Sequence, residues 1–455
     1  MYWANFIHIY QPPIQKEVWI KRIAEECYRK IFSGLLDIPR SRLSLNINGV
    51  LCELLEKYGA KDVLENIKKL VDRGNIELTG SAKYHAFLPL MPEAEIERQI
   101  SLNEETLNHY FGSSWKRGGF FSPEMAYSKK VAQVAKKMGY KWIIVDELGF
   151  PSQRGPADNA IYRIKDLDEF KVFFRDRRLS FTILSAQIGA GILPTILRYI
   201  GEQRLKSDVY SVTAMDGETF GHHRPGLEML LFDIFKSSDI EPVLVSDLIN
   251  KFPNSVVVDP KDSTWATTRK NLKENKPFAR WKDEDNSVQK KQWELTDLAI
   301  KLVQQNLSDT ESRSMLDRAL HSDQYWWSSA KPWWSLEMIE RGAFELKQII
   351  TRSAIASEED KKRAEELYKD VLFTGFEWQR TGLVDEIARH ENEEIQEKME
   401  VKERLFVTKE EYRQMINNLK KQVSLSAKAE DYYRAAMIKD RIRELTEEME
   451  KSGPQ

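Results

Sequence analysis

Short runs of β-branched and aromatic residues alternate with amphipathic helical stretches over the first 260 residues. The run YWANFIHIY opens this pattern, and RLSLNI is followed by the helix-like VLCELLEKY. Further strand-like runs are NIELTG, GGFFS, YKWIIVD, FKVFFRD and DVYSVTAMD. Six or seven such β-α units predict an α/β fold with a parallel barrel. Chemistry in such barrels lies at the C-terminal ends of the strands, so the polar residues after each apolar run are the first candidates.

The strand pattern ends near residue 260 and is replaced by helical periodicity. Four stretches carry apolar residues at three- and four-residue spacing, namely VQKKQWELTDLAIKLVQQN, ESRSMLDRALHSDQ, SLEMIERGAFELKQIITRSA and EEDKKRAEELYKDVLFTG. They predict an all-α helical bundle. A charged run then leads to two helical stretches between Lys409 and Lys451, which predict a helical hairpin. The expected domains are a barrel at 1–260, a bundle at 261–400 that completes the cleft, and a hairpin at 405–455.

Composition narrows the function classes. Lys and Arg number 69 against 71 Asp and Glu, so the chain has no basic field to hold nucleic acid. Two cysteines without metal-ligand spacing argue against a disulfide framework or a zinc cluster. No signal-peptide pattern is present, and the longest uncharged run, Leu179–Leu197, contains Ser, Gln, Gly and Pro. We therefore expect a cytoplasmic protein that binds neither membrane nor nucleic acid.

Two acidic residues follow strand-like runs directly. Glu124 lies in GGFFSPEMAYS, where Pro123 stiffens the chain and Phe121 is placed to line a pocket. Asp216 lies in TAMDGETFGHH, where glycines permit tight turns. Two carboxyl groups at the mouth of one barrel suit a retaining glycosidase. The alternative is that either acid merely caps the next helix.

Histidines and aromatic residues support a polar cleft. His8, His85 and His222 all follow strand-like runs, and the stretch SDQYWWSSAKPWWS concentrates Trp326 and Trp327 with further aromatic residues. Aromatic faces beside polar groups are typical of sugar-binding clefts, although core packing also explains part of such a cluster. The histidines also permit a metal site, but no HxxxH, GxGxxG or P-loop motif occurs. We expect no metal and no cofactor.

The ordered motifs HIYQP, GNIELTGSAKYHAFLP, GGFFSPEMA, AMDGETFG and YWWSSAKPWW, with STWATT, resemble glycoside hydrolase family 57 over about residues 1–390. This family contains retaining α-glucan-active amylases, 4-α-glucanotransferases and branching enzymes. The resemblance implies a seven-stranded (β/α) barrel followed by a helical region, with Glu124 as nucleophile and Asp216 as general acid/base. It also implies that His8, Gln11 and His85 line the sugar site.

One residue departs from the family pattern. The first motif of the family usually has a second histidine where this chain has Tyr10. A tyrosine hydroxyl still forms hydrogen bonds, but it cannot act as an imidazole at neutral pH. We expect this change to affect substrate register more than chemistry, with Tyr10 among the substrate-binding residues.

The C-terminal strings YRQMINNLKKQ and YYRAAMIKDRIREL resemble the UVR motif, a helical hairpin also found on unrelated chains as an interaction element. An ordinary coiled-coil tail is the alternative. In both cases a protein partner or self-association through residues 409–451 is expected. The hairpin should lie apart from the catalytic cleft and be dispensable for turnover.

The leading hypothesis is a retaining hydrolase or transglycosylase that acts on α-1,4-glucans or maltooligosaccharides. The choice between hydrolysis and transfer depends on loops that one sequence does not reveal. The alternatives are a catalytically idle glucan-binding scaffold and a metal-dependent polysaccharide deacetylase. The leading hypothesis requires an ionised Glu124 and a protonated Asp216, so their pKa values should differ in that order.

Overall fold

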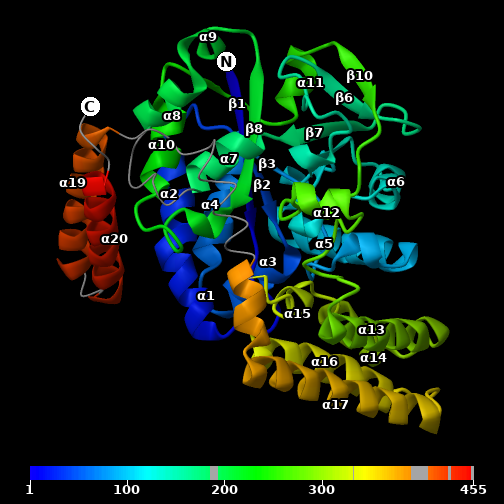
Figure 1. Ribbon diagram of the computed structural model, residues 1–455. Helices are drawn as coiled ribbons and strands as arrows, with labels where there is room; N and C mark the ends of the chain where they lie inside the picture. Colours follow the sequence, from blue (N-terminus) through cyan, green and yellow to red (C-terminus); the bar gives the residue numbers. More distant parts are fainter. Residues whose placement is uncertain (185–192, 332, 391–407, 429–431, 452–455) are drawn as a thin grey trace.

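The strands form two five-stranded sheets (Figure 1). The computed structural model describes residues 1–184, 193–331, 333–390, 408–428 and 432–451. The first sheet has the order β3 (Ile76–Leu78), β2 (Leu43–Ile47), β1 (Tyr2–Ile9) and β8 (Tyr210–Asp216), with β9 (Glu241–Pro242) also paired to β1. The second has the order β10 (Ser255–Val258), β6 (Ile161–Ile164), β7 (Lys171–Arg175), β5 (Trp142–Asp146) and β4 (Gly119–Phe120).

All of the strand pairs are parallel except β6 with β7. Strands β1, β2 and β5 are buried along almost their whole length, which explains their continuous apolar runs. The α/β class predicted from the sequence is therefore confirmed. The sequence did not indicate β6, β9 or β10, of which β6 and β10 lie at one edge of the second sheet and β9 pairs with β1 in the first.

Three backbone hydrogen bonds connect the two sheets. Gly80 donates to the Gly119 carbonyl at 2.9 Å, Phe121 donates to the Gly80 carbonyl at 2.9 Å, and Asp176 donates to the Val212 carbonyl at 2.7 Å. A side chain at Gly80 would collide with the Tyr140 ring, so glycine permits this approach. Because β3 and β4 are very short, they do not form a long ladder, and the strands of the described residues pair as two sheets of five. This pairing does not confirm the seven-stranded barrel that was expected.

Helices connect and surround the strands of the first 260 residues (Figure 1). They are α1 (Glu17–Ile23), α2 (Arg29–Leu36), α3 (Gly49–Lys57), α4 (Lys61–Asp72), α5 (Glu93–Phe111), α6 (Lys129–Lys137), α7 (Arg177–Leu184), α8 (Leu193–Ile200), α9 (Glu202–Leu205), α10 (Glu228–Lys236) and α11 (Asp247–Lys251). Their apolar faces pack with one face of the strands in a large buried core, and the other face of the strands, with Phe6 and Ile144, forms a second buried cluster.

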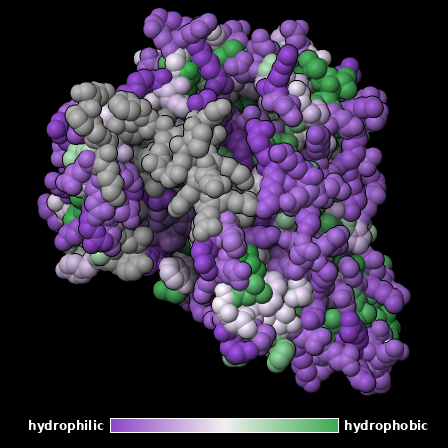
Figure 2. All heavy atoms as spheres, viewed as in Figure 1, coloured by the Kyte–Doolittle hydropathy of each residue, from purple (hydrophilic) through white to green (hydrophobic). Residues whose placement is uncertain are grey.

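The chain after β10 is helical in its described part, as the periodicity predicted. The helices are α12 (Arg269–Lys273), α13 (Ser287–Gln305), α14 (Thr310–Ala319), α15 (Asp323–Trp326), α16 (Leu336–Arg352) and α17 (Glu358–Thr381). Side chains of Asn286, Asp309, Ser335 and Ser357 cap the first turns of the four long ones. Figure 2 shows the same face of the molecule as mainly hydrophilic, with one hydrophobic and neutral patch low on it.

The C-terminal hairpin, α19 (Lys409–Lys428) with α20 (Tyr432–Lys451), packs against the α/β part of the chain. The Glu411 carboxylate accepts hydrogen bonds from Arg198 of α8 at 2.8 and 3.0 Å and from the Thr195 hydroxyl at 2.6 Å. The Gln422 side chain lies so close to Gly226 that any side chain there would clash. The hairpin is therefore anchored to α8 through Glu411. Its expected position apart from the catalytic cleft stays a prediction. The expected boundaries at residues 400 and 405 lie outside the described residues.

In the parts of the chain that the structure describes, no helix has the length and apolarity needed to cross a bilayer. The uncharged run Leu179–Leu197 lies partly outside these parts.

We predict that Glu411→Gln weakens hairpin docking. Although burial opposes ionisation, hydrogen bonds from Arg198 and Thr195 lower the pKa of Glu411 to about 2. A folded-state pKa below the unfolded value means that this stabilisation is present at neutral pH and disappears as the pH falls toward 2. Loss of the charge should cost about 1–3 kcal/mol, measured as faster amide hydrogen exchange in α19 at pH 7.

Glu410→Gln is the matched control, since Glu410 only forms an exposed pair with Arg413 at 3.3 Å. Its effect should stay within about 0.5 kcal/mol. Equal exchange rates in the two variants would mean that the Arg198 pair does not hold the hairpin.

Candidate active site

Three neighbouring parallel strands of the first sheet end with polar side chains in register. His8 of β1 lies opposite Asn46 on one side and opposite Asp216 of β8 on the other. The His8 Nδ1 atom and the Asn46 Oδ1 atom are 2.7 Å apart. Because parallel strands all end at the same edge of a sheet, the register itself gathers these groups.

His85 faces His8 across this edge. Its Nε2 atom lies 3.1 Å from the His8 Nε2 atom, and its Nδ1 atom lies 2.9 Å from the Ser322 hydroxyl oxygen. Burial lowers the pKa of His85 to about 4 and holds the pKa of His8 well below its usual value. Both imidazoles are therefore neutral at pH 7, and they provide hydrogen bonds instead of positive charge.

Glu124 is held in a left-handed backbone conformation just after β4. Its φ is 61°, which is costly for a residue with a side chain and is typical of functional sites. The Trp265 indole donates to the Glu124 Oε2 atom at 2.9 Å, and the Ser322 hydroxyl donates to Oε1 at 3.5 Å. Burial and the negative charge of Asp216 raise the pKa of Glu124 to about 8.

Asp216 occupies the last position of β8. It keeps solvent contact, unlike the six buried residues before it, although protein surrounds its carboxyl group on most sides. This surrounding protein displaces water and raises the pKa of Asp216 to about 6, while the nearby Arg175 charge opposes the increase.

The order of these two pKa values is the reverse of the expected one, because Glu124 lies deeper than Asp216 and feels its charge. Between pH 6 and pH 8 the pair holds about one proton. A retaining mechanism also needs one proton and one negative charge on the two carboxyl groups. The total charge on the two carboxyl groups therefore meets this requirement, although the proton lies on Glu124 and not, as expected, on Asp216.

A third carboxyl group, which the sequence analysis missed, lies two residues after Asp216. Glu218 accepts hydrogen bonds from the Tyr28 hydroxyl and, at 3.3 Å each, from the Gln11 side chain and the Tyr10 amide. Burial and the charge of Asp216 raise its pKa to about 7. Gln11 is thus bound to Glu218 at the end of β1.

Tyr10 connects the end of β1 to helix α15. Its ring stacks on His85 with centroids 3.9 Å apart, and its hydroxyl donates to the Asp323 Oδ2 atom at 2.6 Å. Burial opposes ionisation of Asp323, but hydrogen bonds with His321 and with the Tyr10 hydroxyl outweigh it and lower the pKa of Asp323. The tyrosine that departs from the family motif therefore has a specific partner.

A buried ion pair supports the segment that carries Trp265. Asp146 at the end of β5 lies 3.2 Å from Arg175 and 2.9 Å from Arg177. Arg177 also donates to the carbonyl oxygens of Trp265, at 3.3 Å, and Thr267, at 3.0 Å. These bonds fix the indole that contacts Glu124.

The other predicted residues differ in position. Phe121 stacks on His8 with a centroid distance of 4.7 Å and therefore belongs to the site. His222 lies 2.6 Å from Glu26 and contacts the rings of Trp19 and His223 instead. Trp326 packs against Trp281, and Trp327 packs against Trp333. Within the described structure, none of these last three predicted residues forms a hydrogen bond or ion pair with either carboxylate.

Four contributing residues were absent from the predicted set, namely Glu218, Trp265, Ser322 and Asp323. Weak signals existed for three of them in the sequence. Trp265 lies in the motif STWATT, and Ser322 and Asp323 precede the tryptophan cluster. Their roles depend on approaches between distant segments, which local patterns do not encode. Among the described residues, no group of three or more His, Cys, Asp or Glu side chains is arranged to hold a metal ion.

Comparison with known proteins places this geometry in a family. The model of the Glycosyl hydrolase family 57 matches residues 5–260, more than half of the chain. The chain belongs to this family, as the sequence motifs indicated.

Individual relatives are distant. An alpha-amylase of Pyrococcus horikoshii is 26% identical over 273 residues, covering 56% of this chain and 42% of that protein. A 4-alpha-glucanotransferase of Thermococcus litoralis is 23% identical over 306 residues, covering 62% and 45% respectively. The chain thus spans less than half the length of these two relatives.

The solved structure of a GH57 branching enzyme from Thermococcus kodakaraensis has the same fold. It superimposes with a TM-score of 0.61 at 15% identity, covering 81% of this chain and 94% of that one. The similarity therefore extends beyond the α/β part into the helical region.

We predict that Trp265→Phe raises the pKa of Glu124 further above 8. The indole donates to the ionised carboxylate and stabilises it, so its loss favours the protonated form by about one pH unit. Carbon-13 NMR titration of labelled glutamate side chains measures this value, with Glu124→Gln identifying the resonance. Trp19→Phe removes an indole on α1 and should leave the titration unchanged. An unchanged midpoint in Trp265→Phe would contradict the role of this bond.

Proposed function

We propose that the protein is a retaining glycoside hydrolase or transglycosylase that acts on α-1,4-glucans. The observation that carries this proposal is the pair Glu124 and Asp216, two carboxyl groups that hold about one proton at neutral pH. Membership of family 57 and the alpha-amylase and 4-alpha-glucanotransferase names of the relatives support the substrate class.

In the proposed reaction Glu124 attacks the anomeric carbon while Asp216 protonates the departing glycosidic oxygen. A covalent glycosyl-enzyme forms, and Asp216 then removes a proton from water or from a sugar hydroxyl, which releases the product. Trp265 and Ser322 hold the Glu124 oxygens in place for the attack. The exposed position of Asp216 suits a residue that exchanges protons with the leaving group and with water.

The residues around this pair suit a sugar ring. His8 and His85 are neutral hydrogen-bonding groups, and Phe121 and Trp265 supply aromatic surface beside them. We propose that they bind the sugar nearest the cleavage point together with Tyr10 and Gln11. Trp326 and Trp327 are proposed to bind more distant sugar units, and His222 remains a weaker candidate.

The finer features of the fold are also proposals. Strands β1, β2, β3, β4, β5, β7 and β8 are proposed to form the seven-stranded barrel, which the hydrogen bonds at Gly80 and Asp176 support. The bundle contributes Ser322 and Asp323, in keeping with a domain that completes the cleft. The hairpin formed by α19 and α20 is proposed to be a UVR-like element with a protein partner or a second copy as ligand.

Incubation with maltoheptaose tests the reaction. Shorter products alone indicate hydrolysis, and a ladder of both shorter and longer products indicates transfer. Glu124→Gln should abolish turnover while leaving glucan affinity measurable. Glucan binding by the unmodified protein with no products would favour the idle scaffold, and absence of any product from any α-glucan would contradict the proposed function.

The deacetylase alternative has less support. The ring nitrogens of His8 and His85 already bind Asn46, Ser322 and each other, so these imidazoles are not arranged as open metal ligands. Acetate release from an acetylated polysaccharide that disappears in EDTA would favour it.

We predict different behaviour for the two carboxyl variants on substrates with good leaving groups. Asp216→Ala should still form the glycosyl-enzyme from nitrophenyl maltosides, since nitrophenolate leaves without a proton, whereas natural glucans should lose about 10²–10⁴ in rate. Glu124→Ala should lose activity on both, and azide should restore cleavage with inverted anomeric configuration. Similar rates for both variants on nitrophenyl substrates would overturn the assignment of separate roles.

A further inference from the structure

A second cavity lies between the loop after β5 and the segment that enters α12. Its volume is about 170 Å³, and its lining includes Glu147, Phe150, Lys261, Arg269, Leu272 and Lys273 but neither Glu124 nor Asp216. Pockets for drug-sized ligands start at roughly 300 Å³. The cavity therefore suits a ligand about the size of one monosaccharide.

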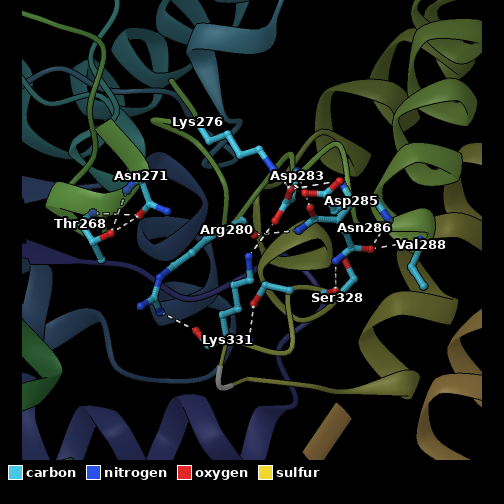
Figure 3. A network of polar contacts seen from close by, with 12 residues as sticks. Thr268, Asn271, Lys276, Arg280, Asp283, Asp285, Asn286, Val288, Ser328 and Lys331 are labelled. Atoms are coloured by element: carbon cyan, nitrogen blue, oxygen red, sulfur yellow. Dashed lines mark hydrogen bonds and ion pairs between the residues drawn. The ribbon is translucent and has the colours of Figure 1, made fainter. Parts of the chain in front are cut away.

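Three cations line this cavity without a partner. In the described parts of the chain, the side chains of Lys261, Arg269 and Lys273 form no hydrogen bond or ion pair. Neighbouring cations of the same region are neutralised, as Figure 3 shows. Lys276 lies 3.3 Å from Asp283 and 2.5 Å from Asp285, and Lys331 lies 2.7 Å from Asp283. Lys261, Arg269 and Lys273 therefore differ from these two neighbouring lysines, because their positive charges are not neutralised by any described residue.

The rest of the lining is not that of a simple anion site. Phe150 and Leu272 provide apolar surface, and the carboxyl group of Glu147 is held in place because it accepts a hydrogen bond from the Arg177 amide at 3.2 Å. Burial raises the pKa of Glu147. A carboxyl group binds sugar hydroxyls but repels an anion. The combination suits a ligand with an anionic end and a hydroxylated, partly apolar end.

We propose that this cavity binds a phosphorylated monosaccharide. The phosphate lies among Lys261, Arg269 and Lys273, where the planar guanidinium binds two oxygens and the ammonium groups supply charge. The sugar ring lies over Phe150 and Leu272, with its hydroxyls toward Glu147. Trp265, the donor to Glu124, lies between Lys261 and Arg269 in the chain, so the ligand contacts the segment that carries it.

Isothermal titration of the full chain with glucose 6-phosphate at low ionic strength tests the proposal. We expect saturable binding of one ligand that weakens strongly at about 0.3 M salt, because exposed charges are screened there. Inorganic phosphate is the second probe and should bind at least tenfold more weakly, since it uses only the cations. Equal affinity for the two probes would overturn the sugar part of the assignment.

Variants separate this cavity from the catalytic cleft. The triple substitution Lys261→Gln, Arg269→Gln and Lys273→Gln should weaken binding at least tenfold, and the single reversal Lys273→Glu should act in the same direction. Lys116→Gln with Lys236→Gln and Lys290→Gln is the matched control elsewhere on the surface and should leave affinity unchanged. Glucose 6-phosphate that binds the triple variant as tightly as the unmodified chain, or that binds neither, would overturn the proposal.

Discussion

The repulsion between two carboxyl groups that protein surrounds on most sides constrains the whole site. Glu124 and Asp216 are not both ionised at neutral pH, because burial and the charge of Asp216 raise the pKa of Glu124, and like charges interact strongly where protein replaces much of the water. The imidazoles of His8 and His85 do not compensate this negative charge, because burial keeps them neutral. The compensating charge comes from Arg175, which lowers the pKa of Asp216 and is itself paired with Asp146. One proton therefore remains on the pair at neutral pH.

The fold produces this arrangement through strand ends and one strained residue. Parallel register places His8 and Asp216 side by side without any contribution from loops. Glu124 needs more support, because its left-handed backbone is unfavourable on its own. Trp265 supports Glu124 through two hydrogen bonds. Its indole donates to the Glu124 carboxylate, and its backbone amide donates to the Glu124 carbonyl. Arg177 in turn fixes the Trp265 segment, so the strain at Glu124 is offset by a chain of buried polar contacts.

Local pattern was sufficient for the parts of this structure that depend on local physics. The continuous apolar runs mark β1, β2 and β5, and the helical periodicity marks α13, α14, α16 and α17, so these elements were predicted correctly. The 19-residue helix α5 was not predicted. The contacts of Ser322 with Glu124 and of Asp323 with Tyr10 join residues 198 and 313 positions apart, and no periodicity encodes them. The docking of Glu411 on Arg198 depends on a similar long-range approach. The prediction of the order of the two pKa values was wrong for the same reason, because the relative depth of Glu124 and Asp216 depends on the tertiary structure.

Tyr10 departs from the family motif, but it forms specific contacts within the site. Its ring covers one face of His85, and its hydroxyl saturates one oxygen of Asp323. A sugar hydroxyl that approaches Asp323 would therefore compete with the Tyr10 hydroxyl, which donates to Asp323 at 2.6 Å. A histidine side chain at this position would be shorter and would have a different set of donors and acceptors. Glu218 binds the Tyr10 amide from the other side, so the ring has little freedom to move away. If the cleft binds a sugar as proposed, displacing Tyr10 would affect substrate binding, because among the described residues its hydrogen bonds go to Glu218 and Asp323 and not to Glu124 or Asp216.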